Sequence, residues 1–420
     1  MYSRPDGKGG TITYYYSDAM IWGLAALALA WLLWFWFSRY LRARAMRRLP
    51  RRSNSKSLKR VIKLKNELSS QYLRPGSSTR IHAVGIGMLA PANDYCLQVF
   101  INEGNDELWA GAGGANLPAS YRGVPLVTVL MPAAAFLSEG EISNLVPDPG
   151  STQYPKGIRE LQEVIIGGIS GANTNLTGQS GTIGYFCTRK SKLPRRREVH
   201  LLSNSHVFAD LRKAEIDKGD LILQPSPGEA GSNRPIGALV NFSTLTFDGD
   251  ISEPNSVDAA IAKLWGPQRH NPVIPLIGTI KGYVAKEDIK VGESARKFGR
   301  TTGYTEGSIF SIYLDIWIRY DRTGQSAFFH DQFLIAPGAP AFAKFVDKGD
   351  SGSLVVDADQ HALGLIFAGM SDAPDTPAEV QAASPDQTDA EANKYQRLEG
   401  YGVANSISEV MDRLNIELLI

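Results

Sequence analysis

The chain has 420 residues, of which 43% are apolar and 21% charged, and this globular composition excludes a mostly disordered protein. Its length predicts two or three structural units. The net charge of +1 is unevenly distributed: residues 38–65 carry twelve basic groups and no acid, whereas residues 66–420 carry 30 basic and 41 acidic groups. Two cysteines, Cys96 and Cys187, exclude a disulfide framework and a CxxC metal site.

After a short N-terminal tail, residues 1–18, the uncharged stretch 19–37 predicts a transmembrane helix. Nineteen helical residues extend about 28 Å, close to the hydrocarbon thickness of a bilayer. A cleaved signal peptide is one alternative, but its positive charge should precede the apolar core, and here the arginines follow it from Arg39 onward. A buried helix of a soluble protein is the other alternative.

The excess of lysine and arginine after this stretch predicts a single-pass membrane protein whose body lies in the cytoplasm. The basic juxtamembrane neck, residues 38–75, should contact anionic lipid headgroups. It includes a helix over residues 56–73, which Pro75 and Gly76 end. A nucleic-acid-binding arm is the rival interpretation, but the adjacent apolar segment explains the charge without a nucleic-acid partner.

Residues 76–150 predict a small α/β unit. Strand-like runs cover residues 81–89, 95–101 and 126–130, and a turn-rich stretch at 147–150 marks the end of the unit.

Beyond residue 160 the sequence consists of short apolar or β-branched runs separated by turn residues, which predicts an antiparallel barrel or sandwich. The segment 371–394 interrupts this pattern with three prolines and six acids, so we expect a mobile acidic loop there. The chain closes with a short amphipathic helix, residues 406–414.

The strongest local signal is the segment 348–353, Lys-Gly-Asp-Ser-Gly-Ser. A nucleophilic serine needs a bent backbone that exposes its hydroxyl and directs amide N–H groups at the developing oxyanion, and the glycines beside Ser351 permit that bend. The four-letter string alone would arise by chance in about one or two of every hundred chains of this length.

A serine also needs a base, and the base needs an orienting acid. His206 lies where an apolar strand ends and a loop or short helix begins, a setting that the other five histidines lack. Asp258 interrupts a run otherwise suited to burial, and a buried carboxylate requires a hydrogen-bonding partner. A solvated histidine and an aspartate at the start of a surface strand are the alternative interpretations of these two residues.

Together these segments resemble the chymotrypsin-like (trypsin-like) serine proteases, in a bacterial and plant branch that includes the narrow-leaf type. The order His, Asp, Ser matches, as do further segments around the three residues: Gly181–Gly184, Asn204–Val207, Val257–Ala260, Lys297–Gly303 and Gly400–Asn405. The resemblance covers about residues 165–415.

The resemblance implies a mainly β fold with two antiparallel six-stranded barrels, residues 160–270 and 271–420, and the site between them. Ser351 would be the nucleophile, His206 the base and Asp258 the group that orients the imidazole. The backbone N–H groups of Gly349 and Ser351 would form the oxyanion hole. No metal or organic cofactor is implied.

Three departures from the family pattern concern the surroundings of the site. Some group other than a cleaved N-terminus must hold Asp350, and the strand 364–369 lacks the serine that relatives place near the catalytic aspartate. Phe345, six residues before Ser351, stands where relatives often set primary specificity and suggests an apolar or shallow pocket.

The sequence therefore predicts a membrane-anchored serine endopeptidase acting on protein or peptide substrates. The alternative is a catalytically silent or latent scaffold of the same fold that gathers protein partners at the membrane.

Overall fold

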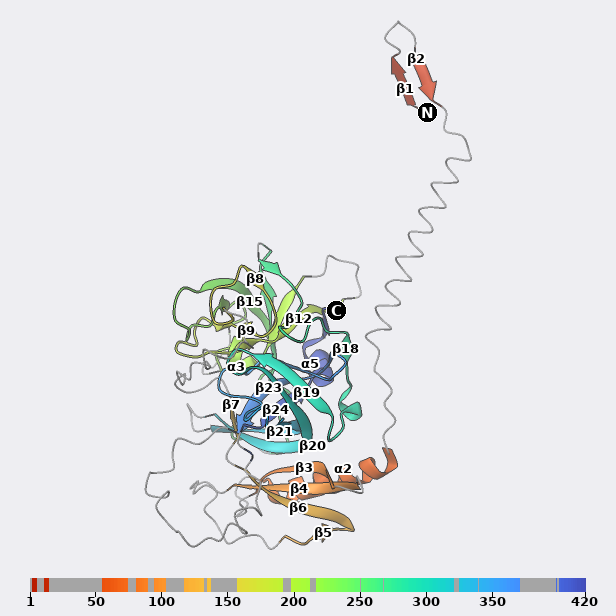
Figure 1. Cartoon of the computed structure of the whole chain (residues 1–420), viewed down its shortest axis with the longest axis vertical. Helices are drawn as coiled ribbons and strands as arrows, with labels where there is room; N and C mark the ends of the chain where they lie inside the picture. Colours follow the sequence, from red (N-terminus) through yellow and green to blue (C-terminus); the bar gives the residue numbers. More distant parts are fainter. Residues whose placement is uncertain are drawn as a thin grey trace. The chain divides into compact units, whose positions relative to one another are not determined.

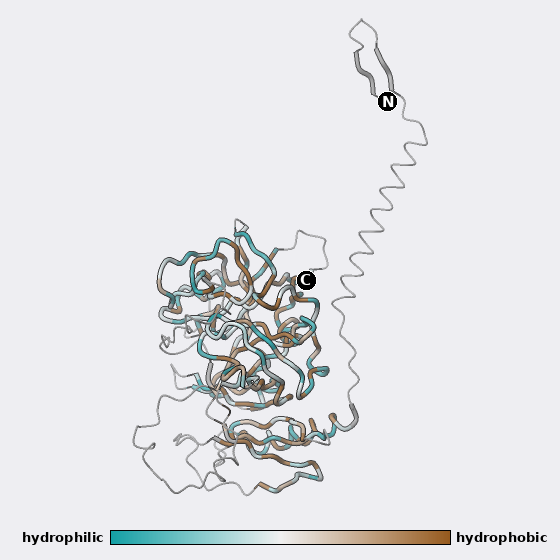
Figure 2. Tube along the Cα trace, viewed as in Figure 1, coloured by the Kyte–Doolittle hydropathy of each residue, from teal (hydrophilic) through white to brown (hydrophobic). Residues whose placement is uncertain are grey.

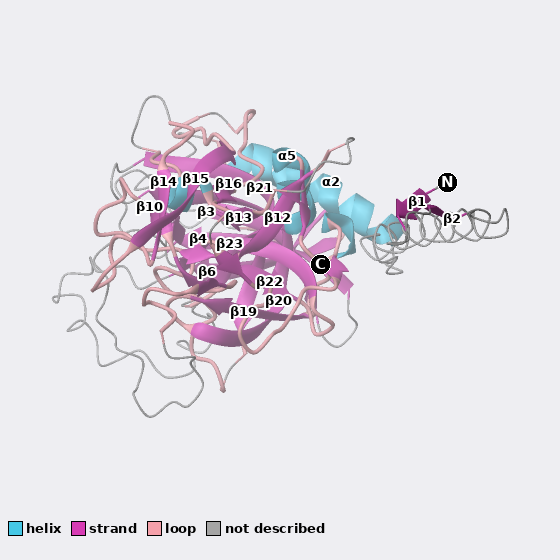
Figure 3. Cartoon of the chain, turned by 90° about the horizontal axis from the view of Figure 1, so that it is seen from above, coloured by secondary structure: helices cyan, strands magenta, loops and turns pink. Residues whose placement is uncertain are grey.

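The computed structural model describes residues 2–5, 11–14, 55–74, 81–89, 94–102, 117–131, 134–136, 157–191, 198–211, 217–249, 251–266, 268–320, 325–338, 340–370, 398 and 400–420. Most of the regular structure in these residues is β-strand (Figure 3), so the mainly β class is confirmed. The chain divides into two compact units, Met1–Arg47 and Arg48–Ile420.

The first unit contains one described element, an antiparallel hairpin of β1 (Tyr2–Pro5) and β2 (Thr11–Tyr14). The predicted membrane segment, 19–37, and the first part of the basic neck lie outside the described residues. Among the helices that are described, none is long and apolar enough to span a membrane.

The predicted neck helix is α2 (Ser55–Tyr72), the first described element of the second unit. It buries Leu58, Val61, Leu64 and Leu68 against the strands that follow it, as the 3.6-residue period requires. These strands are β3 (Ile81–Leu89), β4 (Asp94–Asn102), β5 (Ser120–Tyr121), β6 (Val124–Met131) and β7 (Ala134–Phe136). The three strands predicted in this region are therefore confirmed.

These N-terminal strands lie on the side of β20 and β21 (Figure 1) and belong to the larger of the two main sheets. The strand order of this sheet is β19-β22-β23-β24-β21-β20-β3-β4-β6-β5. Because β19 also pairs with β20, the first six strands of this order pair in a ring. Besides the N-terminal strands, the sheet contains β18 (Gly282–Tyr283), β19 (Ser294–Gly299), β20 (Gly303–Tyr320), β21 (Gln325–Pro337), β22 (Leu354–Val356), β23 (His361–Met370) and β24 (Gly402–Ser406). One turn of 3-10 helix, η2 (Lys286–Asp288), follows β18.

The smaller main sheet has seven strands in the order β10-β14-β15-β16-β13-β12-β25. They are β10 (Ala172–Asn173), β12 (Tyr185–Arg189), β13 (His200–Ser203), β14 (Leu221–Gln224), β15 (Arg234–Phe242), β16 (Ala260–Leu264) and β25 (Ile416–Leu418). Two short pairs accompany it: β9 (Ile169–Ser170) with β11 (Thr182–Ile183), and β8 (Val164–Ile165) with β17 (Arg269–His270).

Two helices complete the described fold: α3 (Ser205–Phe208) and α5 (Ile407–Leu414), which confirms the predicted C-terminal helix. Its buried face consists of Ile407, Val410, Met411 and Leu414. The residue after it, Asn415, has a left-handed backbone (φ 55°), which ends the helix.

The prediction of two six-stranded barrels is confirmed only as a mainly β architecture. The smaller sheet pairs seven strands in an open order, and the larger one continues from β20 into β3. β20 is 18 residues long, so its first half pairs with β19 and its second half with β3. The predicted α/β unit therefore shares a sheet and an apolar core with the rest of the second unit. Figure 2 shows hydrophobic stretches of chain in both parts.

Candidate active site

His206 and Asp258 are brought together by the pairing of β13 with β16. Ser203, at the end of β13, lies opposite Ala260, so the residue two before β16 lies beside the first turn of α3. One carboxylate oxygen of Asp258, Oδ1, accepts hydrogen bonds from the backbone N–H groups of Ser205 (2.7 Å) and His206 (3.3 Å). The other, Oδ2, bonds to Nδ1 of His206. Both side chains are fully buried, so the carboxylate orients an imidazole away from water.

Ser351 lies in a turn between β21 and β22 that two glycines shape. Gly349 and Gly352 have φ values of +98° and +94°, a region that L-residues with a Cβ rarely adopt. The backbone carbonyl of Ser351 accepts a hydrogen bond from the N–H of Thr182 (2.8 Å). Its hydroxyl donates to the carbonyl of Phe367 on β23 (3.2 Å). The serine is thus held in a defined turn and is itself buried.

The serine turn packs directly against the strand that leads to His206. A Cβ added to Gly352 would lie 2.3 Å from the hydroxyl oxygen of Ser203 and 2.2 Å from the carbonyl oxygen of Thr182. Ser203 in turn donates to that same carbonyl (2.8 Å) and precedes His206 by three residues. The nucleophile candidate and the base candidate therefore come from adjoining pieces of backbone in the two main sheets.

Asp350 is held by a group from within the chain. Its Oδ2 lies 3.3 Å from the ammonium of Lys297, and both side chains are fully buried. Its Oδ1 accepts the backbone N–H groups of Thr301 (2.8 Å) and Thr302 (3.2 Å). Burial lowers the pKa of Lys297, an effect that the negative charge of Asp350 opposes.

Lys297 begins the segment Lys297–Gly303 that resembles the family pattern, yet the sequence assigned no role to this lysine. The only local signal was a lysine in a strand that is otherwise suited to burial.

Phe345, the predicted specificity residue, is also fully buried. Its ring lies 5.8 Å below the ammonium of Lys297, and its backbone N–H donates to the carbonyl of Gly400 (2.8 Å). The structure therefore places Phe345 in the core beneath the serine turn.

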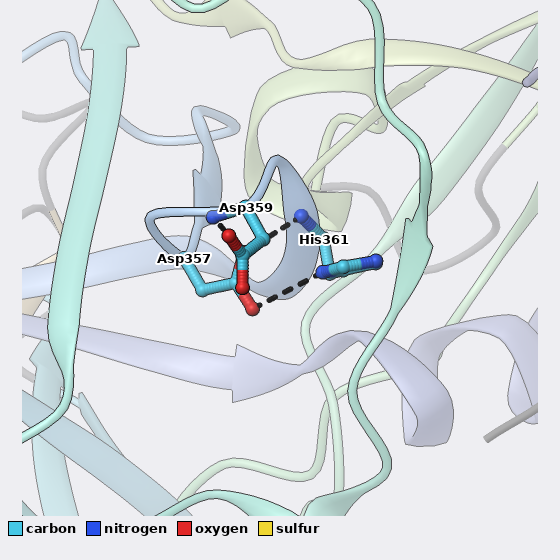
Figure 4. A group of neighbouring side chains, drawn as sticks. All are labelled: Asp357, Asp359 and His361. Carbon is cyan, nitrogen blue, oxygen red and sulfur yellow. Dashed lines mark hydrogen bonds and ion pairs between the residues drawn. The ribbon is translucent and has the colours of Figure 1, made fainter. Parts of the chain in front are cut away.

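One cluster in the described part of the chain has the composition of a metal site: Asp357, Asp359 and His361 in the turn between β22 and β23 (Figure 4). The carboxylate of Asp357 already accepts the N–H groups of Asp359 and His361, both at 2.8 Å, and lies 3.3 Å from the His361 imidazole. These bonds close the turn, and they account for the cluster without an ion.

No protein-family model and no curated protein matches this sequence. Several solved structures are similar, each with 61% of this chain covered. Protease A of Thermobifida fusca is 15% identical (TM-score 0.34, 98% of that chain covered), and a Nocardiopsis protease is 14% identical (0.35, 99%). A chymotrypsin of Cellulomonas bogoriensis is 13% identical (0.35, 98%). With TM-scores below 0.5, these similarities do not bear on activity, which must be inferred from the residues of this chain.

Proposed function

We propose that this chain is a serine endopeptidase that hydrolyses peptide bonds through Ser351, His206 and Asp258. The observation that carries the proposal is the buried, hydrogen-bonded His206–Asp258 pair beside the glycine-framed turn of Ser351. Nucleophilic acyl transfer requires a serine hydroxyl within reach of an imidazole that a carboxylate orients. The His206–Asp258 pair supplies the oriented imidazole, and the Ser351 hydroxyl, which donates to the Phe367 carbonyl (3.2 Å) in this structure, must turn to reach it.

In the proposed mechanism, the Ser351 hydroxyl turns from the Phe367 carbonyl toward Nε2 of His206 when substrate binds. Its oxygen attacks the scissile carbonyl while the imidazole accepts its proton, which later passes to the leaving amine. Asp258 keeps the imidazole in the required tautomer.

The N–H groups of Gly349 and Ser351 would stabilise the oxyanion. Neither donates a hydrogen bond to any residue that the structure describes, so both are available to a substrate.

The test is covalent labelling of the full chain by a fluorophosphonate probe, with the modified residue identified by mass spectrometry. We expect labelling at Ser351, none in Ser351→Ala, and a rate about 10⁴-fold lower in Asp258→Asn, whose amide favours the wrong tautomer. His361→Ala is the matched control, because His361 also lies beside an aspartate but outside the site. Equal labelling of the wild type and Ser351→Ala would refute the proposal.

A latent form of the same enzyme is the second candidate, and the burial of the site favours it. Ser351 has an exposed fraction of 0% and His206 of 1%, so a large substrate needs an opening step. If the acidic segment 371–394 controls access, its deletion raises the labelling rate of Ser351. An unchanged rate would exclude this segment as the control element. A silent scaffold, by contrast, would show no labelling in either form.

We further propose that residues 19–37 anchor the chain in a membrane, with the basic groups of the neck that precede α2 on anionic lipid and the body in the cytoplasm. Support for this comes from the sequence alone. The full chain should stay with the membrane pellet during alkaline extraction, and a variant lacking residues 19–37 should be released. Equal release of both would contradict the anchor.

A further inference from the structure

The main chain of Asp258 is held from the opposite sheet. Its backbone N–H donates to Oδ1 of Asn405 (3.0 Å), a fully buried side chain on β24. Asp258 precedes β16 and His206 follows β13, two strands of the smaller main sheet, whereas β24 and the strand after the Ser351 turn, β22, belong to the larger one. This bond connects the candidate acid to the half of the molecule that carries the candidate nucleophile. The same segment is also tied to that half three residues earlier, where Asn255 exchanges backbone hydrogen bonds with Phe328 and His330 of β21.

Asn405 is itself oriented by a second buried amide, Gln332 on β21. Nδ2 of Asn405 donates to Oε1 of Gln332 (2.6 Å), and Nε2 of Gln332 donates to the carbonyl of Ser256 (3.0 Å). The two amides thus connect the backbone N–H of Asp258 to the backbone carbonyl of Ser256, two residues earlier in the chain.

The orientation of both amides is determined by their partners. The N–H of Asp258 can only donate and the carbonyl of Ser256 can only accept, so flipping either amide would place like atoms against each other. All four polar atoms of the two side chains are engaged. A fully satisfied buried network of this kind fixes its members in one geometry.

The carboxylate of Asp258 depends on this support. Its described partners are the backbone of α3 and the imidazole, both of which follow β13 of the smaller sheet. On β23 of the other sheet, Phe367 and its neighbours offer no hydroxyl side chain. Among the described contacts of Asp258 itself, the main-chain bond to Asn405 is the one that reaches the serine-bearing half.

We propose that Gln332 and Asn405 are positioning residues for catalysis, acting through the main chain of Asp258 to align the His206–Asp258 pair with Ser351. This inference rests on the proposed serine endopeptidase function. It assigns the two amides no contact with substrate.

The test compares Asn405→Leu and Gln332→Met in the full chain with the matched variant Gln224→Met. Gln224 is equally buried, donates to the Glu160 carbonyl (2.8 Å) and accepts the Gln162 N–H (2.8 Å), but lies away from Asp258. We expect Asn405→Leu and Gln332→Met to lower kcat about 10²-fold, the effect of a misplacement of about 1 Å, with KM nearly unchanged. Gln224→Met should keep the kcat of the wild type.

Two further readouts separate positioning from a loss of stability. The double variant Asn405→Leu/Gln332→Met should lose no more activity than the worse single variant, because the two amides act as one unit. The far-downfield proton resonance of the His206–Asp258 hydrogen bond should broaden or vanish in both single variants and persist in Gln224→Met. If Asn405→Leu does not fold, Gln332→Met carries the test alone.

Wild-type kcat in Gln332→Met, or losses that multiply in the double variant, would overturn the positioning role. The failure of the proposed function has a different signature: the wild type itself would not be labelled at Ser351. Labelling of the wild type together with unchanged variants therefore refutes only this inference.

Discussion

At the scale of single residues, the serine turn depends on a buried ion pair. Lys297 and Asp350 are both fully inaccessible to water, and the carboxylate also accepts the N–H groups of Thr301 and Thr302. A buried charge is tolerated only when it is paired and hydrogen-bonded, so each of these residues requires the other. The pair holds Asp350 in place. Because Asp350 lies between Gly349 and Ser351, the pair also positions the backbone N–H groups of the candidate oxyanion hole.

Removal of the lysine charge should destabilise the protein strongly. Lys297→Met leaves Asp350 buried without its cation, and we expect the free energy of unfolding to fall by about 3–5 kcal/mol. Urea denaturation of the full chain measures this change.

The matched control is Lys263→Met, because Lys263 pairs with Glu198 at the surface, where both side chains are about half exposed. An exposed pair contributes at most about 1 kcal/mol. Equal losses in the two variants would show that burial of the Lys297 pair has no special role.

At the scale of elements, α2 is fastened to the sheet by polar contacts as well as by its apolar face. Lys65, only 1% exposed, lies 2.7 Å from Asp315 on β20 and 3.3 Å from Asp331 on β21. Near the C-terminal end of the helix, the indole of Trp317 donates to the carbonyl of Leu73 (2.9 Å). The helix that follows the predicted membrane anchor in the sequence is thus part of the second compact unit.

The stability that the ion pairs of Asp331 contribute should depend on pH. Burial raises the pKa of Asp331, but the charges of Lys65 and Lys286 outweigh it and lower the pKa overall. A carboxyl group whose pKa is lower in the folded chain adds stability above its ordinary value of about 4, and this stability is lost as the pH falls through the lowered value.

Asp331→Asn should therefore be less stable than the wild type by about 1.5–3 kcal/mol at pH 7, and the difference should shrink below pH 4. Asparagine tolerates the left-handed backbone of this position (φ 57°), so the substitution tests the charge rather than the conformation. Urea midpoints measured from pH 7 down to pH 3 give the comparison. A difference that stays constant with pH would contradict the role of the charge.

At the scale of the whole molecule, residues 48–420 form a single compact unit in which the N-terminal strands continue the larger sheet. β20 pairs with β3 along one edge, and the indole of Trp317 donates to the carbonyl of Leu73, the residue after α2. Residues 160–420 therefore have a partner along β20 that the preceding part of the chain provides.

A fragment of residues 157–420 should lose this partner. It would expose the edge of β20 and the apolar side chains that α2 and β3 cover, each worth about 1.5–3 kcal/mol when fully buried. We expect a lower Tm than that of residues 48–420, or insoluble protein. A fragment that unfolds at the Tm of the longer chain would show that the two parts are independent domains.

The local elements were predictable because they depend on neighbours in sequence. The spacing of Leu58, Val61, Leu64 and Leu68 predicts α2, and alternation with turn residues predicts β3 and β4. The candidate triad was predictable for a related reason: the backbone bend of Ser351 and the strand end before His206 are short-range features.

What the sequence by itself determined is this local content: the class of the fold and the helix in the neck. It also singled out the three residues that we propose for catalysis. Only the tertiary structure decided that Lys297 pairs with Asp350, that Asn405 and Gln332 support Asp258, and that β3 joins β20. Each of these contacts links positions between 53 and 233 residues apart in the sequence. No short-range pattern specifies such a partner, because it is selected by burial and by the need of each buried polar group for a bond.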